Sequence, residues 1–139
     1  MSVEEQSAVI HRWIESWNSK DLDAIEDLLA SDYVRHDANL PDVDGPAAQL
    51  EFIAGVLSAF PDLHVQTEQL IAQDDHVAVR VSMRGTHRGE FVGVPATGRE
   101  VRFESMEIFR LDRSKVAEQW VVINALGLFQ QLGAIPGPG

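Results

Sequence analysis

The spacing of apolar residues changes at Leu63, from the period of a helix to the alternation of a strand. The alternating half divides into four runs that are long for a small domain, with turn-forming residues at Asp74-Asp75, Arg88 to Thr97, and Asp112 to Ser114. This pattern predicts an antiparallel meander. Because long sheets twist, we expect the sheet to curl and to leave a hollow under its concave face.

The first half of the sequence carries helix signals. Ser2 and Glu5 match a capping box, Pro46 suits the first position of a helix, and Gly133 suits a C-cap. The apolar spacing predicts three N-terminal helices, over about 2–18, 21–31 and 46–60. It also predicts a short strand over about 32–37 and a short C-terminal helix over about 125–132.

These elements predict an α+β fold, a cone in which a curved antiparallel sheet wraps over three N-terminal helices. A chain of 139 residues can bury one sizeable core and is too short for two ordinary domains. We therefore expect a single domain over 1–139, with a flexible tail over about 134–139.

Composition excludes several function classes. The 22 acidic and 11 basic residues give a net charge of -11, which repels nucleic acid and anionic membranes. No apolar run approaches the roughly 20 residues of a membrane span, so we expect a cytoplasmic protein. The absence of cysteine excludes disulfides, a thiolate nucleophile and thiolate metal ligands.

Nothing in the sequence predicts a metal or a cofactor. The histidines are dispersed and lack the spacing of a zinc site, and no phosphate-binding loop, dinucleotide fingerprint or nucleophile elbow is present. The five histidines are His11, His36, His64, His76 and His87.

Two of the strand-like runs place titratable groups in apolar rows. Glu107 and Ser105 share a face with the apolar row from Val101 to Phe109, where burial would raise the pKa of Glu107 and make it a base near neutrality. In the preceding run, His87 ends on the face of the row from Val77 to Met83. The alternatives are a Glu107 that faces solvent and a His87 that binds a loop carbonyl.

The last run is apolar on both faces. One face carries Trp120 with Glu118 and Asn124, and the other carries Val121 and Ile123. An apolar outer sheet face usually needs a cover, so we expect a homodimer.

Four segments of the chain resemble the SnoaL-like polyketide cyclase branch of the nuclear-transport-factor-2-like superfamily. They are WNSKDLDAIEDLLASDYVRHD, GTHRGEFVGVPATGREVRF, MEIFR and KVAEQWVVINALGLFQQLG. In those cyclases an Asp, four residues after the Trp of the last strand, is the general acid/base of an intramolecular aldol closure. Asn124 occupies that position here, and an amide cannot take up a carbon-bound proton.

The resemblance also implies a site. His36 matches the pocket histidine of the family. The base would then be His36 or one of the two groups that strand alternation suggests, His87 and Glu107, and Asn124 could donate a hydrogen bond to an enolate oxygen. The residues expected to bind substrate are Trp17, Asp37, Phe91, Phe103, Ser105 and Trp120.

The leading hypothesis is a proton-transfer enzyme of aldol cyclase or isomerase type, acting on a hydrophobic, carbonyl-bearing or polyketide-like small molecule. A non-catalytic binding protein that lost the base is the first alternative. The second is an epoxide hydrolase-like enzyme with an Asp-Arg-Asp relay, whose three residues the sequence does not place.

Overall fold

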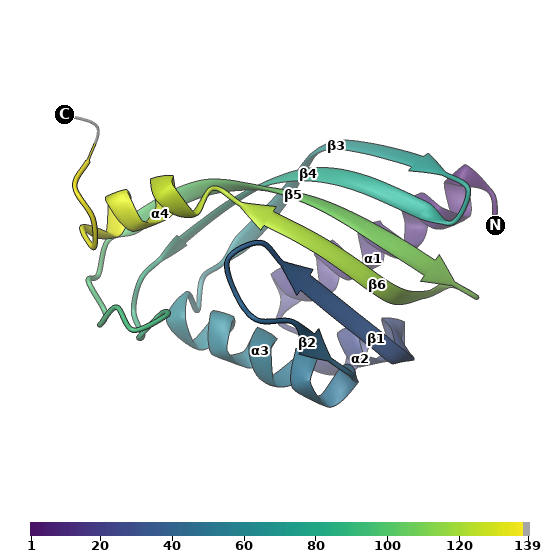
Figure 1. Ribbon diagram of the computed structural model, residues 1–139, viewed down its shortest axis with the longest axis horizontal. Coiled ribbons are helices and arrows are strands. Elements are labelled where there is room, and N and C mark those ends of the chain that lie inside the picture. Colours follow the sequence, from purple (N-terminus) through teal and green to yellow (C-terminus); the bar gives the residue numbers. More distant parts are fainter. Residues whose placement is uncertain (138–139) are drawn as a thin grey trace.

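The computed structural model describes residues 1–137, and it confirms the α+β fold (Figure 1). The helices are α1 (Val3–Ser19), α2 (Leu22–Leu28), α3 (Pro46–Ala59) and α4 (Ala125–Leu132). The strands are β1 (Leu29–Asp37), β2 (Val43–Asp44), β3 (His64–Gln73), β4 (His76–Thr86), β5 (Glu100–Asp112) and β6 (Lys115–Ile123).

The strands form one sheet in the order β2-β1-β6-β5-β4-β3. The predicted antiparallel meander is confirmed for β3 to β6. The sheet is not wholly antiparallel, however, because β1 pairs with β6 in parallel. Pairing between β1 and β6 joins segments that lie far apart in the sequence, and no local pattern in the sequence indicates it.

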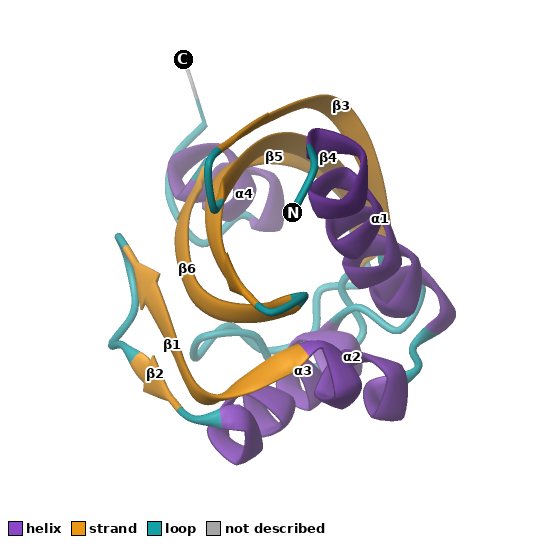
Figure 2. Ribbon diagram, turned by 90° about the vertical axis from the view of Figure 1, so that its right-hand side faces the viewer, coloured by secondary structure: helices purple, strands orange, loops and turns teal. Residues whose placement is uncertain are grey.

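The sheet curls strongly, as Figure 2 shows, with α1 beside β3 and α3 beside β1. Trp13 on α1 packs edge-on against Phe109 of β5, with ring centroids 5.6 Å apart. Leu128 and Leu132 of α4 are buried as well. The curled sheet and the helices thus enclose one hydrophobic core.

The local signals of the sequence hold at most element ends. Ser2 and Glu5 form the capping box, Pro46 opens α3, and Gly133 ends α4 in the left-handed conformation. The second helix ends at Leu28 rather than near Ser31, because residues from Leu29 onward extend into β1. Residues 138–139 of the expected tail lie outside the described residues.

Candidate functional site

A cavity with about 100 Å³ of free interior space lies between the concave face of the sheet and the helices α1 and α3. Its walls are mainly apolar and aromatic, as small-molecule sites usually are. The aromatic members are Trp13, Trp17, Phe52, Phe60, Phe91, Phe103 and Phe109. Six polar or charged side chains interrupt this lining, namely Arg35, Asp37, Gln49, Ser105, Glu107 and Gln119.

Glu107 projects into the cavity from the middle of β5. Alternation along that strand puts it on the face of Ser105 and Phe109, both of which are buried. It lines the cavity, and burial raises the pKa of its carboxyl group. A carboxylate with a raised pKa is a stronger base than an exposed one.

Two buried side chains hold Glu107 in place. Gln119 on β6 donates a hydrogen bond from Nε2 to Glu107 Oε1 over 2.6 Å. The hydroxyl of Tyr33 on β1 donates to Gln119 Oε1, also over 2.6 Å. Because a phenol oxygen donates to the amide oxygen, the amide nitrogen must face the carboxylate.

A buried ion pair lies on the β1 wall of the cavity. Arg35 Nη2 and Asp37 Oδ2 are 2.9 Å apart, and their side chains are 8% and 2% exposed. The two residues are two positions apart on one strand, so they share the inward face with Tyr33. The Arg35 guanidinium carbon also lies 4.2 Å from the centre of the Phe52 ring, a cation–π contact with α3.

Most of the residues expected to bind substrate line this cavity. Trp17, Asp37, Phe91, Phe103 and Ser105 belong to the lining together with Glu107. Their substrate contacts remain a prediction.

Trp120 is a correction, because it lies on the outer face of the sheet. In β6 the inward residues are Gln119, Val121 and Ile123. Val121 pairs with Glu107 and Trp120 pairs with Ile108, and partners across a ladder point to the same side. Since both faces of β6 are apolar, the sequence alone did not fix which one faces inward.

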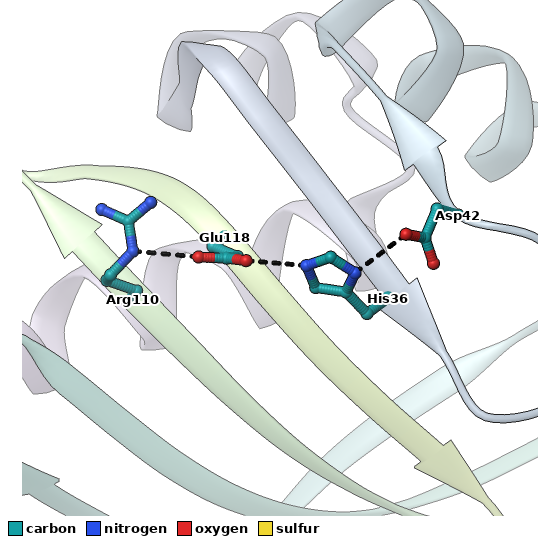
Figure 3. Close-up of polar contacts among 4 residues, drawn as sticks. All are labelled: His36, Asp42, Arg110 and Glu118. Atoms are coloured by element: carbon teal, nitrogen blue, oxygen red, sulfur yellow. Dashed lines mark hydrogen bonds and ion pairs between the residues drawn. The ribbon is translucent and has the colours of Figure 1, made fainter.

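His36 also lies outside the cavity, on the outer face of β1. Its ring binds Glu118 Oε2 at 2.7 Å and Asp42 Oδ2 at 3.0 Å (Figure 3). The ring also stacks on Trp120. Arg110 completes the network through Glu118 Oε1. The hydrogen bond that the ring donates to the Glu118 carboxylate raises the pKa of His36. Its position follows from alternation, since Arg35 and Asp37 take the inward positions.

Asn124 does not face the cavity either. It is exposed and caps α4, since its Oδ1 accepts a hydrogen bond from the backbone N–H of Gly127 over 3.0 Å. The enolate-stabilising role expected of Asn124 is therefore wrong for this geometry.

His87 is fully buried but lies one layer behind the cavity wall. It packs on Phe60 with ring centroids 5.4 Å apart. The backbone N–H of Thr97 donates to its Nδ1, so Nδ1 is the acceptor and the proton of the neutral ring resides on Nε2. The strand ends at Thr86, so the alternation of β4 does not extend to His87.

Sequence reasoning missed Arg35, Gln49 and Gln119. A long polar side chain in a strand or helix usually faces solvent, which is why these three were passed over. The usable signal was the alternation itself: Tyr33, Arg35 and Asp37 share one face of β1.

Among residues 1–137, no group of three His, Cys, Asp or Glu side chains is close enough to hold a metal ion. Within the same part of the chain, no helix is long and apolar enough to cross a membrane.

The fold and cavity define the class of this protein: an α+β cone that encloses an apolar small-molecule site with a buried carboxyl group. The family model for SnoaL-like polyketide cyclases matches residues 7–132. The chain therefore belongs to the SnoaL-like polyketide cyclase family.

Similar proteins include cyclases. Aklanonic acid methyl ester cyclase DnrD of Streptomyces peucetius is 25% identical over 131 residues, which cover 92% of this chain and 90% of the cyclase. AclR of Streptomyces galilaeus, a candidate hydroxylase of known structure, is 34% identical with a TM-score of 0.89; the match covers 99% of this chain and 87% of AclR. An LEH-like epoxide hydrolase of M. tuberculosis shares the fold with a TM-score of 0.77 at 12% identity, over 94% of this chain and 91% of the hydrolase.

Proposed function

We propose that this protein is a proton-transfer enzyme of aldol cyclase or isomerase type that acts on a hydrophobic, carbonyl-bearing or polyketide-like molecule. The single observation that carries the proposal is Glu107, a carboxyl group with a raised pKa inside an apolar cavity. Similarity to aklanonic acid methyl ester cyclases agrees with a polyketide-like substrate. In this account Glu107 takes the role that an Asp at position 124 plays in the family.

The chemistry needs one group that accepts and returns a proton. The Glu107 carboxylate removes a proton from a carbon next to a carbonyl group, and the electron pair of the C–H bond moves to the carbonyl oxygen as an enolate. In an aldol closure the enolate carbon then attacks a second carbonyl carbon of the same molecule. Protonated Glu107 returns its proton to the alkoxide that forms, or, in an isomerisation, to another carbon.

Exchange of α-hydrogens tests this role without the natural substrate. The probe is 2-tetralone, an apolar bicyclic ketone with acidic α-hydrogens, and NMR follows their replacement in deuterated buffer. We expect the wild-type protein to accelerate exchange and Glu107→Gln to abolish the acceleration. Glu104→Gln is the matched control, since Glu104 lies on the same strand but is exposed on the outer face.

The same experiment separates the enzyme from a binding protein. If the wild-type protein binds 2-tetralone but leaves its exchange at the buffer rate, the protein is a binder that retained the cavity. If the Glu107→Gln protein exchanges 2-tetralone as fast as the wild type, the role of Glu107 is refuted.

A second candidate function is epoxide hydrolysis. The Arg35–Asp37 ion pair and Glu107 supply two carboxyl groups and an arginine in one cavity, the same functional groups as an Asp-Arg-Asp relay that activates water, with a Glu in place of one Asp. This candidate predicts hydrolysis of cyclohexene oxide faster than in buffer, followed by gas chromatography, and its loss in Asp37→Asn. Exchange of 2-tetralone without diol formation would favour the first candidate.

We also propose that the chain forms a homodimer through the outer face of the sheet. Ile71, Met106, Ile108 and Val122 are 59%, 64%, 44% and 57% exposed there, beside Trp120. A second copy would cover this apolar surface. Sedimentation equilibrium at micromolar concentration should give a dimer for the wild type and for the control Val92→Glu, and a monomer for Val122→Glu. A monomeric wild type would contradict the proposal.

The absence of cysteine agrees with a reducing compartment. We therefore propose a cytoplasmic location, and cell fractionation with an antibody against the chain would test it.

A further inference from the structure

Two polar side chains in the cavity wall carry buried atoms that find no hydrogen-bond partner among residues 1–137. The atoms are Arg35 Nη1 and Gln49 Oε1. Buried polar atoms are paired in the great majority of cases, so unpaired ones that gather around one cavity need an explanation. A ligand whose own polar groups meet them provides it.

Arg35 is held by two contacts, and one of its nitrogen atoms stays unpaired. Its Nη2 pairs with Asp37, and its planar face lies on the Phe52 ring. These two contacts fix the guanidinium, which presents several N–H donors in one plane. The unpaired donor, Nη1, therefore has a defined direction before any ligand arrives.

Gln49 lies on the same wall. It precedes Phe52 by three positions on α3, so the two side chains are neighbours on one helix face. Its side chain is 1% exposed, and the unpaired atom is an acceptor, whereas that of Arg35 is a donor.

We propose that Arg35 holds the carbonyl oxygen of the ligand through Nη1 and stabilises the negative charge on that oxygen when Glu107 removes a proton. Gln49 accepts a hydrogen bond from a hydroxyl group of the same ligand. The substrate class is an apolar, aromatic or polycyclic ketone that also carries a hydroxyl group. This inference rests on the proposed function.

The charges balance in this step. The proton moves from the ligand carbon to Glu107, and one negative charge moves from Glu107 to the ligand oxygen. Because the total charge of the cavity is unchanged, the step buries no additional charge, and the Arg35 cation can stabilise the enolate that forms.

The test measures binding rather than turnover. The probe is 4-nitro-1-naphthol, whose naphtholate form is coloured and resembles an enolate; 1-nitronaphthalene has the same ring system without the hydroxyl oxygen. Glu107→Gln imitates the protonated carboxyl group. This variant removes a negative charge from the cavity. At a pH at which Glu107 of the wild type is ionised, we therefore expect the variant to bind naphtholate more tightly than the wild type.

Arg35 is then removed from the Glu107→Gln protein. The paired change Arg35→Met with Asp37→Asn takes away the cation without leaving a buried charge unpaired, and Arg35→Lys keeps the charge but loses the planar fork. We expect naphtholate affinity to fall about tenfold or more in the paired variant. Affinity for 1-nitronaphthalene should stay within about twofold. Arg80→Lys, on the outer face, is the matched control.

Several results would overturn the assignment. Equal losses for both probes mean that Arg35 only supports the wall, and no loss means that no oxygen binds there. If the paired variant does not fold, Arg35→Lys decides, because it must weaken naphtholate binding selectively. If Glu107→Gln leaves α-hydrogen exchange intact, the proposed function fails, while the binding comparison still reports on Arg35.

Gln49 has its own probe pair, 6-hydroxy-2-tetralone and 2-tetralone. In Gln49→Leu the hydroxylated ketone should lose several-fold in affinity, whereas the plain ketone should not. Equal behaviour of the two ketones would refute the hydroxyl subsite.

Discussion

Gln119 and Glu107 are joined by a 2.6 Å hydrogen bond inside the cavity, and Tyr33 fixes the direction of that bond by donating to the other end of the Gln119 amide. The candidate base is therefore oriented by residues from β1 and β6, the two strands that pair in parallel.

Tyr33→Phe should lower the free energy of unfolding by about 1–2 kcal/mol, because it leaves the buried Gln119 oxygen without its donor. Chemical denaturation measures this change. The variant should also slow 2-tetralone exchange, since the Gln119 amide is free to turn away from Glu107. A variant as stable and as active as the wild type would show that the chain of hydrogen bonds has no role.

Asp37→Asn should destabilise the protein by about 3–5 kcal/mol, because it leaves the buried Arg35 cation without its counter-ion. Adding Arg35→Met should recover most of this loss. Glu104→Gln breaks the exposed pair with Arg80, which is 3.1 Å long, and should cost less than about 1 kcal/mol. Equal effects at the two pairs would argue against burial of the Arg35–Asp37 pair.

Glu107→Gln should become more stable than the wild type as pH rises. The folded-state pKa of Glu107 is raised above its unfolded value of about 4.3, so the native state holds the proton more tightly. Its contribution is favourable at low pH and is lost as pH rises through the folded pKa. Urea unfolding of both proteins, from below about pH 4.3 to above the folded pKa of Glu107, would measure this change in the free energy of unfolding. A difference between the two proteins that stays constant with pH would contradict a buried Glu107.

His36 should titrate above its ordinary pKa of about 6.5, since Glu118 and Asp42 both bind its ring (Figure 3). The stabilisation from this raised pKa is complete below about 6.5 and disappears as pH rises through the folded value. NMR titration of the ring should show a downward shift in Glu118→Gln. A pKa that this change does not move would exclude Glu118 as the cause.

The sequence was sufficient for the inward face of β5. Strict alternation placed Glu107 and Ser105 in an apolar row, and the ladder with β4 carries no irregularity that would disturb it. The helices were predictable for a similar reason, because their caps are local signals.

The sequence was not sufficient for β6 or β1. Both faces of β6 are apolar, and the register shift between Arg110 and Leu111 breaks a simple count of alternate residues. The large Trp120 therefore drew the prediction to the wrong face. For β1 the parallel pairing with β6 turns Arg35 inward, and nothing in the neighbouring residues distinguishes it from a solvent-facing arginine.

The most direct test of the account is the pH dependence of 2-tetralone exchange, set beside the carboxyl pKa of Glu107 from ¹³C NMR. The account predicts that wild-type exchange rises with a single ionisation whose midpoint lies above the ordinary pKa of Glu and coincides with the NMR value. The rise should be absent in Glu107→Gln. A midpoint that departs from the Glu107 titration, or a rise that survives in Glu107→Gln, would contradict the claim that Glu107 is the base.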